Sequence, residues 1–348
     1  MHTPLIINNT PNCKPHPWHP SVVYCEKIWN GHRWWMAQTP LPPTDVSPYR
    51  DRYELPCIHF SDDGIHWDPI PSNPIDDIDE SMVMAHNYLS DPHLLLHNGV
   101  LECYYRLSLL NNCQLIGNKT LLLKKTSTDG THWSEREVVA DLRREEDISI
   151  WGEQIISQAV VWDGAHYRCW YVDRSGYLKN RRILMTTSTD GHIWEPYSIC
   201  NLLGTPDFDP WHIDVQFFDG EYQMLLFDEW NLHFLSSSDG INFHYISHVL
   251  TPTLLFTDFY SHGIYRACSV KVKDKILVYF SAKTERQASI GLLSTTDRKH
   301  FVPENGISFI DYFPKFILRN LSFKNIKRFV KRKLRIIMPQ LLKKNKVF

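Results

Sequence analysis

Ser127-Thr128-Asp129-Gly130-Thr131-His132-Trp133 is the clearest of five related turns along this chain. Each copy places a Ser or Thr two residues before an Asp, with an aromatic residue closing the turn. The other copies are Ser61-Asp62-Asp63-Gly64-Ile65-His66-Trp67, Ser188-Thr189-Asp190-Gly191-His192-Ile193-Trp194, Ser237-Ser238-Asp239-Gly240-Ile241-Asn242-Phe243 and a degenerate Thr295-Thr296-Asp297-Arg298-Lys299-His300-Phe301. The Asp residues are 66, 61, 49 and 58 positions apart, a spacing that indicates a supersecondary unit that stacks on its neighbours.

The chemistry of the turn explains its fixed residues. Gly adopts a positive φ without steric cost, so Asp-Gly marks a tight turn. The Ser or Thr and Asp side chains can hydrogen-bond to nearby backbone N–H groups, and the aromatic residue anchors the turn in a hydrophobic layer. We therefore interpret the repeat as structural and expect no catalytic role for its Asp residues.

A β-hairpin precedes each turn. Its first strand is apolar, its second strand is rich in aromatic residues, and a third strand leads into the Ser-x-Asp-Gly turn. Such hairpins are signalled by Asn-Gly and Asp-Gly between apolar runs. The five hairpin turns are predicted at Asn30-Gly31, Asn98-Gly99, Asp163-Gly164, Asp219-Gly220 and Lys273-Asp274. With a short outer strand, each unit has four antiparallel strands, and five units predict an all-β, five-bladed β-propeller.

The composition supports one large domain, which we place at residues 1–310. The chain has 348 residues, of which 43% are hydrophobic and 13% aromatic, enough for an extensive core. The first residues lack the basic segment and apolar run of a secretory signal, and no apolar run reaches the ~18 residues of a membrane-spanning helix. The 8 Cys show no metal-ligand spacing, so reduced thiols in a cytoplasmic protein are expected.

Residues 311–348 are predicted to be a separate basic tail. Positions 313–348 hold 12 Lys/Arg and no Asp/Glu, which leaves 25 basic against 39 acidic residues in the rest of the chain. Its apolar residues recur every three or four positions, as on one face of a helix: Phe323, Ile326, Val330, Leu334, Ile337 and Leu341.

A basic amphipathic helix is typical of a membrane-surface anchor, which would place the protein at the inner membrane face. The alternatives are a helix docked on the acidic propeller or a disordered basic tail. Binding to nucleic acid is not expected, because base-reading motifs are missing and the acidic body would repel phosphate.

Candidate site residues follow from the propeller topology. The innermost strand of each blade lines the central channel, and its first residues open onto the same face as the loop after the second strand. Trp, His, Arg and carboxylate side chains gather at these positions. The predicted catalytic residues are Asp91, Asp214, Glu153, His19 and His212. The predicted substrate-binding residues are Trp18, Arg106, Trp151, Arg174, Trp211, Tyr265, Arg266 and Glu229.

The carboxylates suggest glycoside cleavage, in which one carboxyl group acts as acid and another as base or nucleophile. Asp91 and Asp214 are the first two candidates, and Glu153 is the third. Each also has a plain structural interpretation. Asp91 precedes Pro92 and would form a turn, Asp214 would be buried and bonded to the backbone, and Glu153 would be solvated.

The roles of the two histidines and of Arg266 are also open from the sequence. His19 and His212 would act as acid–base groups, hold a channel-bound metal ion with Asp91 or Asp214, or simply form hydrogen bonds. Apart from such an ion, no cofactor is expected. Arg266 would clamp a carboxylate or phosphate of the ligand, or hold Asp214 in place.

With five blades, the repeated turn and the dipeptide Asp91-Pro92, residues 15–305 resemble the five-bladed β-propeller glycoside hydrolases of families 32, 43, 62, 68 and 130. The resemblance implies a carbohydrate site at the channel mouth, with acidic residues from the first strands of different blades. Asp91 resembles the Asp that stabilises the transition state or tunes the acid, and Glu153 would stand for the acid. In blade one, His19-Pro20 replaces the Asp that serves those families as base or nucleophile.

Three functions remain open from the sequence. The leading one is a carbohydrate-active enzyme that hydrolyses or transfers glycosyl groups on a surface polysaccharide or lipid-linked glycan. The second is a non-catalytic glycan-binding or scaffold propeller associated with membrane polysaccharide synthesis. The third is a propeller that serves only protein–protein contact.

Overall fold

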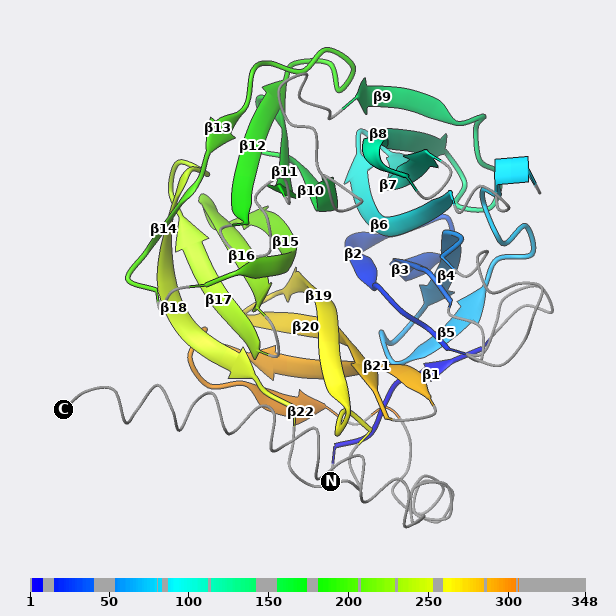
Figure 1. Ribbon diagram of the computed structural model, residues 1–348. Coiled ribbons are helices and arrows are strands. Elements are labelled where there is room, and N and C mark those ends of the chain that lie inside the picture. Colours follow the sequence, from blue (N-terminus) through cyan, green and yellow to red (C-terminus); the bar gives the residue numbers. More distant parts are fainter. Residues whose placement is uncertain are drawn as a thin grey trace, which may run out of the picture.

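Five sheets stand as blades around a common axis, and the protein has the five-bladed propeller fold that the sequence predicts (Figure 1). Each innermost strand contacts the innermost strands of both neighbouring blades, so the ring is closed. The structure is a computed structural model, and it describes residues 2–8, 16–40, 54–79, 81–82, 87–111, 114–141, 155–173, 181–205, 208–228, 231–252, 259–284, 287–304 and 306.

The blades follow one another along the chain. Blade 1 contains β2 (Ser21–Trp29), β3 (His32–Gln38), β4 (Cys57–Ser61) and β5 (His66–Pro69). Blade 2 contains β6 (Tyr88–His97), β7 (Val100–Asn111), β8 (Gln114–Ser127) and β9 (Glu137–Asp141). Blade 3 contains β10 (Ile155–Trp162), β11 (Tyr167–Asp173), β12 (Arg182–Ser188) and β13 (Ser198–Ile199). Blade 4 contains β15 (Pro210–Phe218), β16 (Glu221–Asp228), β17 (Asn231–Ser237) and β18 (Asn242–Leu250), and blade 5 contains β19 (Gly263–Val272), β20 (Lys275–Lys283), β21 (Ala288–Thr295) and β22 (Val302–Glu304).

The predicted hairpin turns join the first two strands of each blade. In Asn30-Gly31, Asn98-Gly99 and Asp219-Gly220 both central residues have positive φ, between 45° and 89°. This backbone suits the right-handed twist of the strands that it connects.

The Ser-x-Asp-Gly turns connect the third and fourth strands, and they link neighbouring blades. In the turn of blade 2, the Ser127 hydroxyl accepts a hydrogen bond from Gly130 N at 2.8 Å, and Asp129 Oδ1 accepts hydrogen bonds from the next two amides. Gly130 lies so close to Trp35 of blade 1 that a Cβ there would come within 2.2 Å of the indole ring. The same relation recurs where Trp170 of blade 3 donates from its indole N–H to Gly240 O of blade 4 at 2.8 Å.

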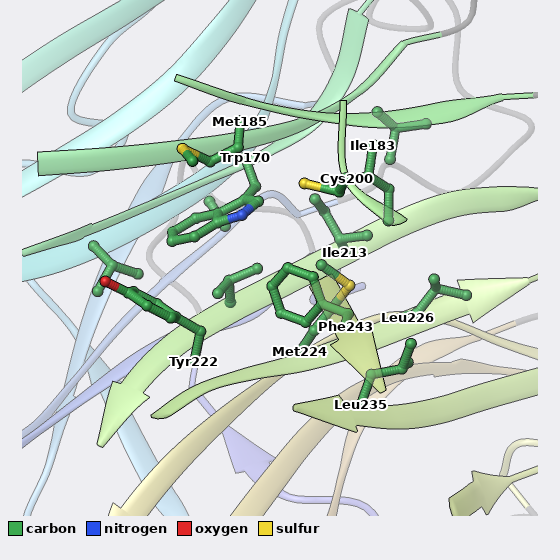
Figure 2. Packing of buried hydrophobic residues seen from close by; sticks show 14 of the residues in the cluster. Trp170, Ile183, Met185, Cys200, Ile213, Tyr222, Met224, Leu226, Leu235 and Phe243 are labelled. Atoms are coloured by element: carbon green, nitrogen blue, oxygen red, sulfur yellow. The ribbon is translucent and has the colours of Figure 1, made fainter. Parts of the chain in front are cut away.

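Hydrophobic clusters fill the seams between blades. The seam between blades 3 and 4 contains Trp170, Met185, Met224 and Phe243, all at most 5% exposed (Figure 2). Burying one such large side chain contributes about 1.5–3 kcal/mol. Because each seam has a comparable cluster, the ring is stabilised at every junction.

An added N-terminal strand spans the junction of blades 5 and 1. β1 (Ile6–Ile7) pairs in parallel with β5 of blade 1, while Leu5 N donates to Ile290 O of β21 in blade 5 at 2.8 Å. The His2 imidazole also hydrogen-bonds to Leu292 O at 2.9 Å. A second added strand, β14 (Asn201–Leu203), pairs with β18 and gives blade 4 a fifth strand.

The basic tail lies outside the described residues, so its helix, its membrane association and the cytoplasmic location stay predictions. Among the residues that are described, no helix has the length and apolar character needed to cross a membrane.

Candidate functional site

Irregular backbone at the start of the innermost strands places the candidate side chains. The pairing of the first two strands shifts between Ser90 and His93 in blade 2, and comparable shifts occur in blades 3, 4 and 5. His19, Asp91 and Ser157 occupy the corresponding places of blades 1, 2 and 3, with φ of 52°, 53° and 56°. Left-handed backbone is costly for such residues, and it is concentrated at functional sites. Outside the hairpin turns and the outer turns, all the described non-glycine residues with positive φ lie in this layer.

His19, Asp91 and His212 come together from blades 1, 2 and 4, as a buried cluster. Asp91 Oδ1 lies 3.7 Å from His19 Nδ1 and 3.8 Å from His212 Nδ1. The two imidazole rings are 5.4 Å apart between centroids. All three side chains are at most 3% exposed, and each can offer a ligand atom within 4.8 Å of the others.

The two oxygens of Asp91 have different surroundings. Oδ2 accepts hydrogen bonds from Arg106 Nε at 2.6 Å and from Ser157 N at 3.1 Å. Oδ1 accepts no hydrogen bond from a described residue, although Arg266 Nη1 lies 3.6 Å away. Burial alone would raise the pKa of Asp91, but the charge of Arg106, helped by its other neighbours, holds the pKa well below its ordinary value. Asp91 is therefore an ionised group with one oxygen to offer.

Both histidines of the cluster are uncharged at neutral pH. Burial lowers the pKa of His19 to about 3 and that of His212 well below its ordinary value. His19 Nδ1 is 2.9 Å from Thr39 Oγ1, whereas His19 Nε2 and both nitrogens of His212 have no hydrogen-bond partner among the described residues. Neutral imidazoles with unshared lone pairs are the form that binds a metal ion.

Arg266 adds a second buried cation beside the cluster. Its Nη2 donates to Gln158 O at 3.0 Å, while Nε and Nη1 have no hydrogen-bond partner in the described part of the chain. The side chain is 1% exposed. Arg266 thus faces Asp91, and no direct ion pair joins it to Asp214 within the described structure, which leaves open the predicted clamp for an anionic ligand group.

Asp214 lies apart from the cluster, two residues further along β15 than His212. It accepts a hydrogen bond from Ser269 N at 3.0 Å, and its Oδ1 is 3.6 Å from His93 Nδ1. Burial raises the pKa of Asp214 to about 6. The backbone contact is the structural alternative that the sequence allowed for this residue.

Three aromatic residues lie above the cluster. Tyr265 stacks on Trp18 at 5.2 Å between ring centroids and on His19 at 5.5 Å, and its edge meets His212 at 4.2 Å. Trp211 donates its indole N–H to the Tyr265 hydroxyl at 2.5 Å. Trp18 is buried, and Tyr265 and Trp211 are half-buried.

Glu54 is a candidate that the search along the sequence missed. It accepts a hydrogen bond from the Ser90 hydroxyl, next to Asp91 in the chain. Glu54 precedes the third strand of blade 1. The candidates named from the sequence lie instead at the first strands and at the ends of the second strands. The acidic residue in Glu54-Leu55-Pro56 was the available signal.

Four predicted residues lie outside the described part of the chain: Glu153, Trp151, Arg174 and Glu229. Their roles stay predictions. Of the other predicted residues, Asp214 lies apart from the cluster. The rest form the cluster or lie beside it: Trp18, His19, Asp91, Arg106, Trp211, His212, Tyr265 and Arg266.

Comparison with known proteins agrees with the fold. No family model matches the chain. The chain is 25% identical over 277 residues to the A type blood N-acetyl-alpha-D-galactosamine deacetylase of Flavonifractor plautii, covering 66% of this chain and 34% of that protein. The chain therefore spans about a third of the length of this curated relative.

Solved structures with the same propeller fold include a deacetylase and glycoside hydrolases. An N-acetylgalactosamine deacetylase from F. plautii, in complex with blood group B trisaccharide, has a TM-score of 0.66 and 21% identity over 84% of this chain and 94% of that chain. The sucrose-6-phosphate hydrolase from Lactobacillus gasseri has a TM-score of 0.61 and 12% identity, covering 88% of this chain and 63% of that chain. A β-xylosidase/α-arabinofuranosidase from a compost metagenome has a TM-score of 0.59 and 10% identity, covering 88% and 98%.

Proposed function

We propose that this chain is a carbohydrate-active hydrolase that removes an acyl group from a sugar, with a divalent metal ion held by His19, Asp91 and His212. The observation that carries the proposal is the set of unpartnered, buried donor atoms in this cluster. Two neutral imidazoles and one carboxylate are a frequent ligand set for catalytic metal ions. The name of the F. plautii relative supports an N-acetylated sugar as the substrate.

The surrounding charges affect how tightly the ion would be held. Arg106 engages only Asp91 Oδ2 and leaves Oδ1 for the metal. The Arg266 guanidinium, 3.6 Å from Oδ1, opposes a cation and would weaken its binding. We therefore expect an ion that a chelator removes and an excess of metal restores.

The residues of the chain supply the remaining chemistry. A bound divalent ion would polarise the acyl carbonyl and lower the pKa of the attacking water. Glu54, oriented by the Ser90 hydroxyl, would take a proton from the water and pass it to the leaving nitrogen. A C–O bond forms, the amide C–N bond breaks, and the products are acetate and a free amino sugar.

Two-carboxylate glycoside cleavage is the second candidate. The pKa of Asp214, about 6, suits a general acid. Its side chain is only 1% exposed, however, and it shares no hydrogen-bond partner with Asp91 among the described residues. Asp91 itself is held ionised by Arg106 and cannot donate a proton.

The predicted basic tail suggests where the substrate is located. A basic amphipathic segment at 313–348 would bring the enzyme to an N-acetylated polysaccharide or lipid-linked glycan at an anionic membrane. Sedimentation of the full chain with phosphatidylserine-containing vesicles tests this part of the proposal, since equal binding to neutral vesicles would contradict it.

The main experiment assays two products in parallel. The full-length protein is incubated with N-acetylhexosamine glycans, and both free acetate and released monosaccharide are measured. We expect acetate alone, loss of activity in EDTA and recovery with added Zn²⁺, Co²⁺ or Mn²⁺. The release of monosaccharide without acetate would favour the glycosidase, and binding without either product would favour the glycan-binding module.

Two variants assign the roles. His212→Ala should lose bound metal, as measured by elemental analysis. Glu54→Gln should keep the metal and lower kcat by about 10²–10⁴-fold, the contribution of a positioned general base. Normal activity of Glu54→Gln would remove Glu54 from the mechanism.

A further inference from the structure

The hydrogen bond between Trp211 and Tyr265 has only one chemically allowed direction. An indole nitrogen donates and cannot accept, so the Tyr265 oxygen must be the acceptor of this 2.5 Å contact. The phenolic proton of Tyr265 is therefore directed elsewhere. Within the described residues, nothing accepts it.

The ring that carries this proton is fixed over the candidate metal cluster. It makes a T-shaped contact with the His212 ring at 4.2 Å between centroids, and it stacks on His19 at 5.5 Å and on Trp18 at 5.2 Å. Tyr265 is nevertheless half-buried rather than buried. Tyr265 is therefore a partly accessible side chain that contacts both histidines of the cluster.

The protonation state of the phenol suits a donor. Burial raises the pKa of Tyr265 above its ordinary value, and the charges of Asp91 and Glu54 add to this effect, although the hydrogen bond from Trp211 opposes it. Even a phenol with an ordinary pKa near 10 keeps its proton at neutral pH. By accepting from Trp211 the hydroxyl is also polarised, and it becomes a stronger donor.

We propose that Tyr265 donates a hydrogen bond to the substrate oxygen that reacts at the His19/Asp91/His212 cluster. This inference rests on the proposed function, in which the oxygen is the acyl carbonyl. Negative charge develops on that oxygen as water adds to the carbonyl carbon, and a fixed donor stabilises the charge more than it stabilises the ground state. No proton leaves Tyr265 in this step.

Tyr265→Phe tests the proposal, because it removes the hydroxyl and keeps the ring over both histidines. We expect kcat to fall by about 10²-fold, typical of the loss of one oxyanion donor, with KM changed less than about 3-fold. The metal content should be unchanged. A kcat within about 3-fold of wild type, or a change in KM alone, overturns the proposal.

Tyr279→Phe is the matched control. This tyrosine donates to Gly64 O at 3.2 Å in the seam between blades 5 and 1, away from the cluster. It should keep the wild-type kcat and unfold at a lower denaturant concentration, because the hydrogen bond to Gly64 is lost. If both variants lose kcat equally, Tyr265 acts only through packing and the proposal is overturned.

A second readout separates this proposal from the deacetylase assignment. If the wild type releases no acetate, the affinity for N-acetylhexosamine oligosaccharides is measured by calorimetry. Binding at least about 10-fold weaker in Tyr265→Phe would keep Tyr265 as the oxygen donor and discard only the reaction. Equal affinities, or no binding by the wild type, would discard Tyr265 as well.

Discussion

The outer turns and the inner strand starts of the propeller obey opposite rules. All five outer turns repeat one hydrogen bond, from the amide three residues on to the Ser or Thr hydroxyl, at 2.8–2.9 Å. At the inner strand starts, the five blades present four kinds of side chain: His19, Asp91, Ser157, His212 and Arg266. The outer turns share one sequence because each must form the same turn. The inner strand starts differ from blade to blade because each contributes a different part of the candidate site.

The two regions also differ in how their polar groups are satisfied. In the turn of blade 4, Asp239 Oδ1 accepts from two amides, both at 2.8 Å, and its other oxygen accepts from Asn242. Around the axis, atoms of His19, Asp91, His212 and Arg266 are buried without a described partner. An unsatisfied buried polar group costs about 1–3 kcal/mol. These unsatisfied groups lower the stability of the folded protein, and a ligand that binds them would raise it again.

Replacing one Asp in each region gives the largest expected contrast. Asp91→Asn breaks the buried ion pair with Arg106, which should cost about 3–5 kcal/mol of stability and abolish measurable acetate release. Asp129→Asn keeps an oxygen for its two amide donors and should leave acetate release unchanged. Denaturant unfolding and the acetate assay measure both effects. If Asp91→Asn retained its activity, the inner carboxylate would be structural, like the Asp residues of the outer turns.

Acid sensitivity of the fold has to be separated from that of the site. Burial lowers the pKa of His2, His59 and His233 to about 4. The unfolded chain, with ordinary values near 6.5, binds more protons between pH 6.5 and 4, so this stability is complete above pH 6.5 and is lost as the pH falls. Asp214 opposes the trend, since its raised pKa favours the folded state below about pH 6.

We expect the histidines to dominate, with an unfolding free energy at pH 5 about 2 kcal/mol or more below that at pH 7. Denaturant melts at the two pH values provide the measurement. His59→Gln should reduce the difference. A melt that does not change with pH would show that these imidazoles are not buried in their neutral form.

A comparison of two glycines measures how much the contact between an outer turn and the neighbouring blade contributes to stability. Gly99 and Gly130 have similar φ, 76° and 80°, but a Cβ at Gly99 meets nothing within 4 Å, whereas one at Gly130 meets Trp35. Gly99→Ala should cost about 1–2 kcal/mol from the backbone alone. Gly130→Ala should cost about 1–3 kcal/mol more from overpacking against Trp35. Equal losses in chemical denaturation would mean that the contact between blades adds nothing.

The contrast also explains what the sequence could predict. The blades follow from local signals, because Asp-Gly turns and alternating strands depend on neighbouring residues. Propeller topology then places His19, Asp91 and His212 at one end of the innermost strands. The sequence allowed a metal site of both histidines with either Asp91 or Asp214, but it could not choose between the two carboxylates, since the choice depends on the bulges and on the left-handed backbone at Asp91. Asp214 illustrates this limit, because a shift of two residues along β15 takes it out of the cluster.

The N-terminal strand has a consequence for how the molecule folds. The contact between His2 and Leu292 joins residues 290 positions apart, and β1 completes the junction of blades 5 and 1. Contacts of such high sequence separation form late and slow the folding of a domain. During synthesis, the first four blades must wait as an open arc, with the apolar face around Trp34 and Met36 lacking its blade 5 partners. This apolar face stays exposed to solvent until blade 5 has been made and has folded.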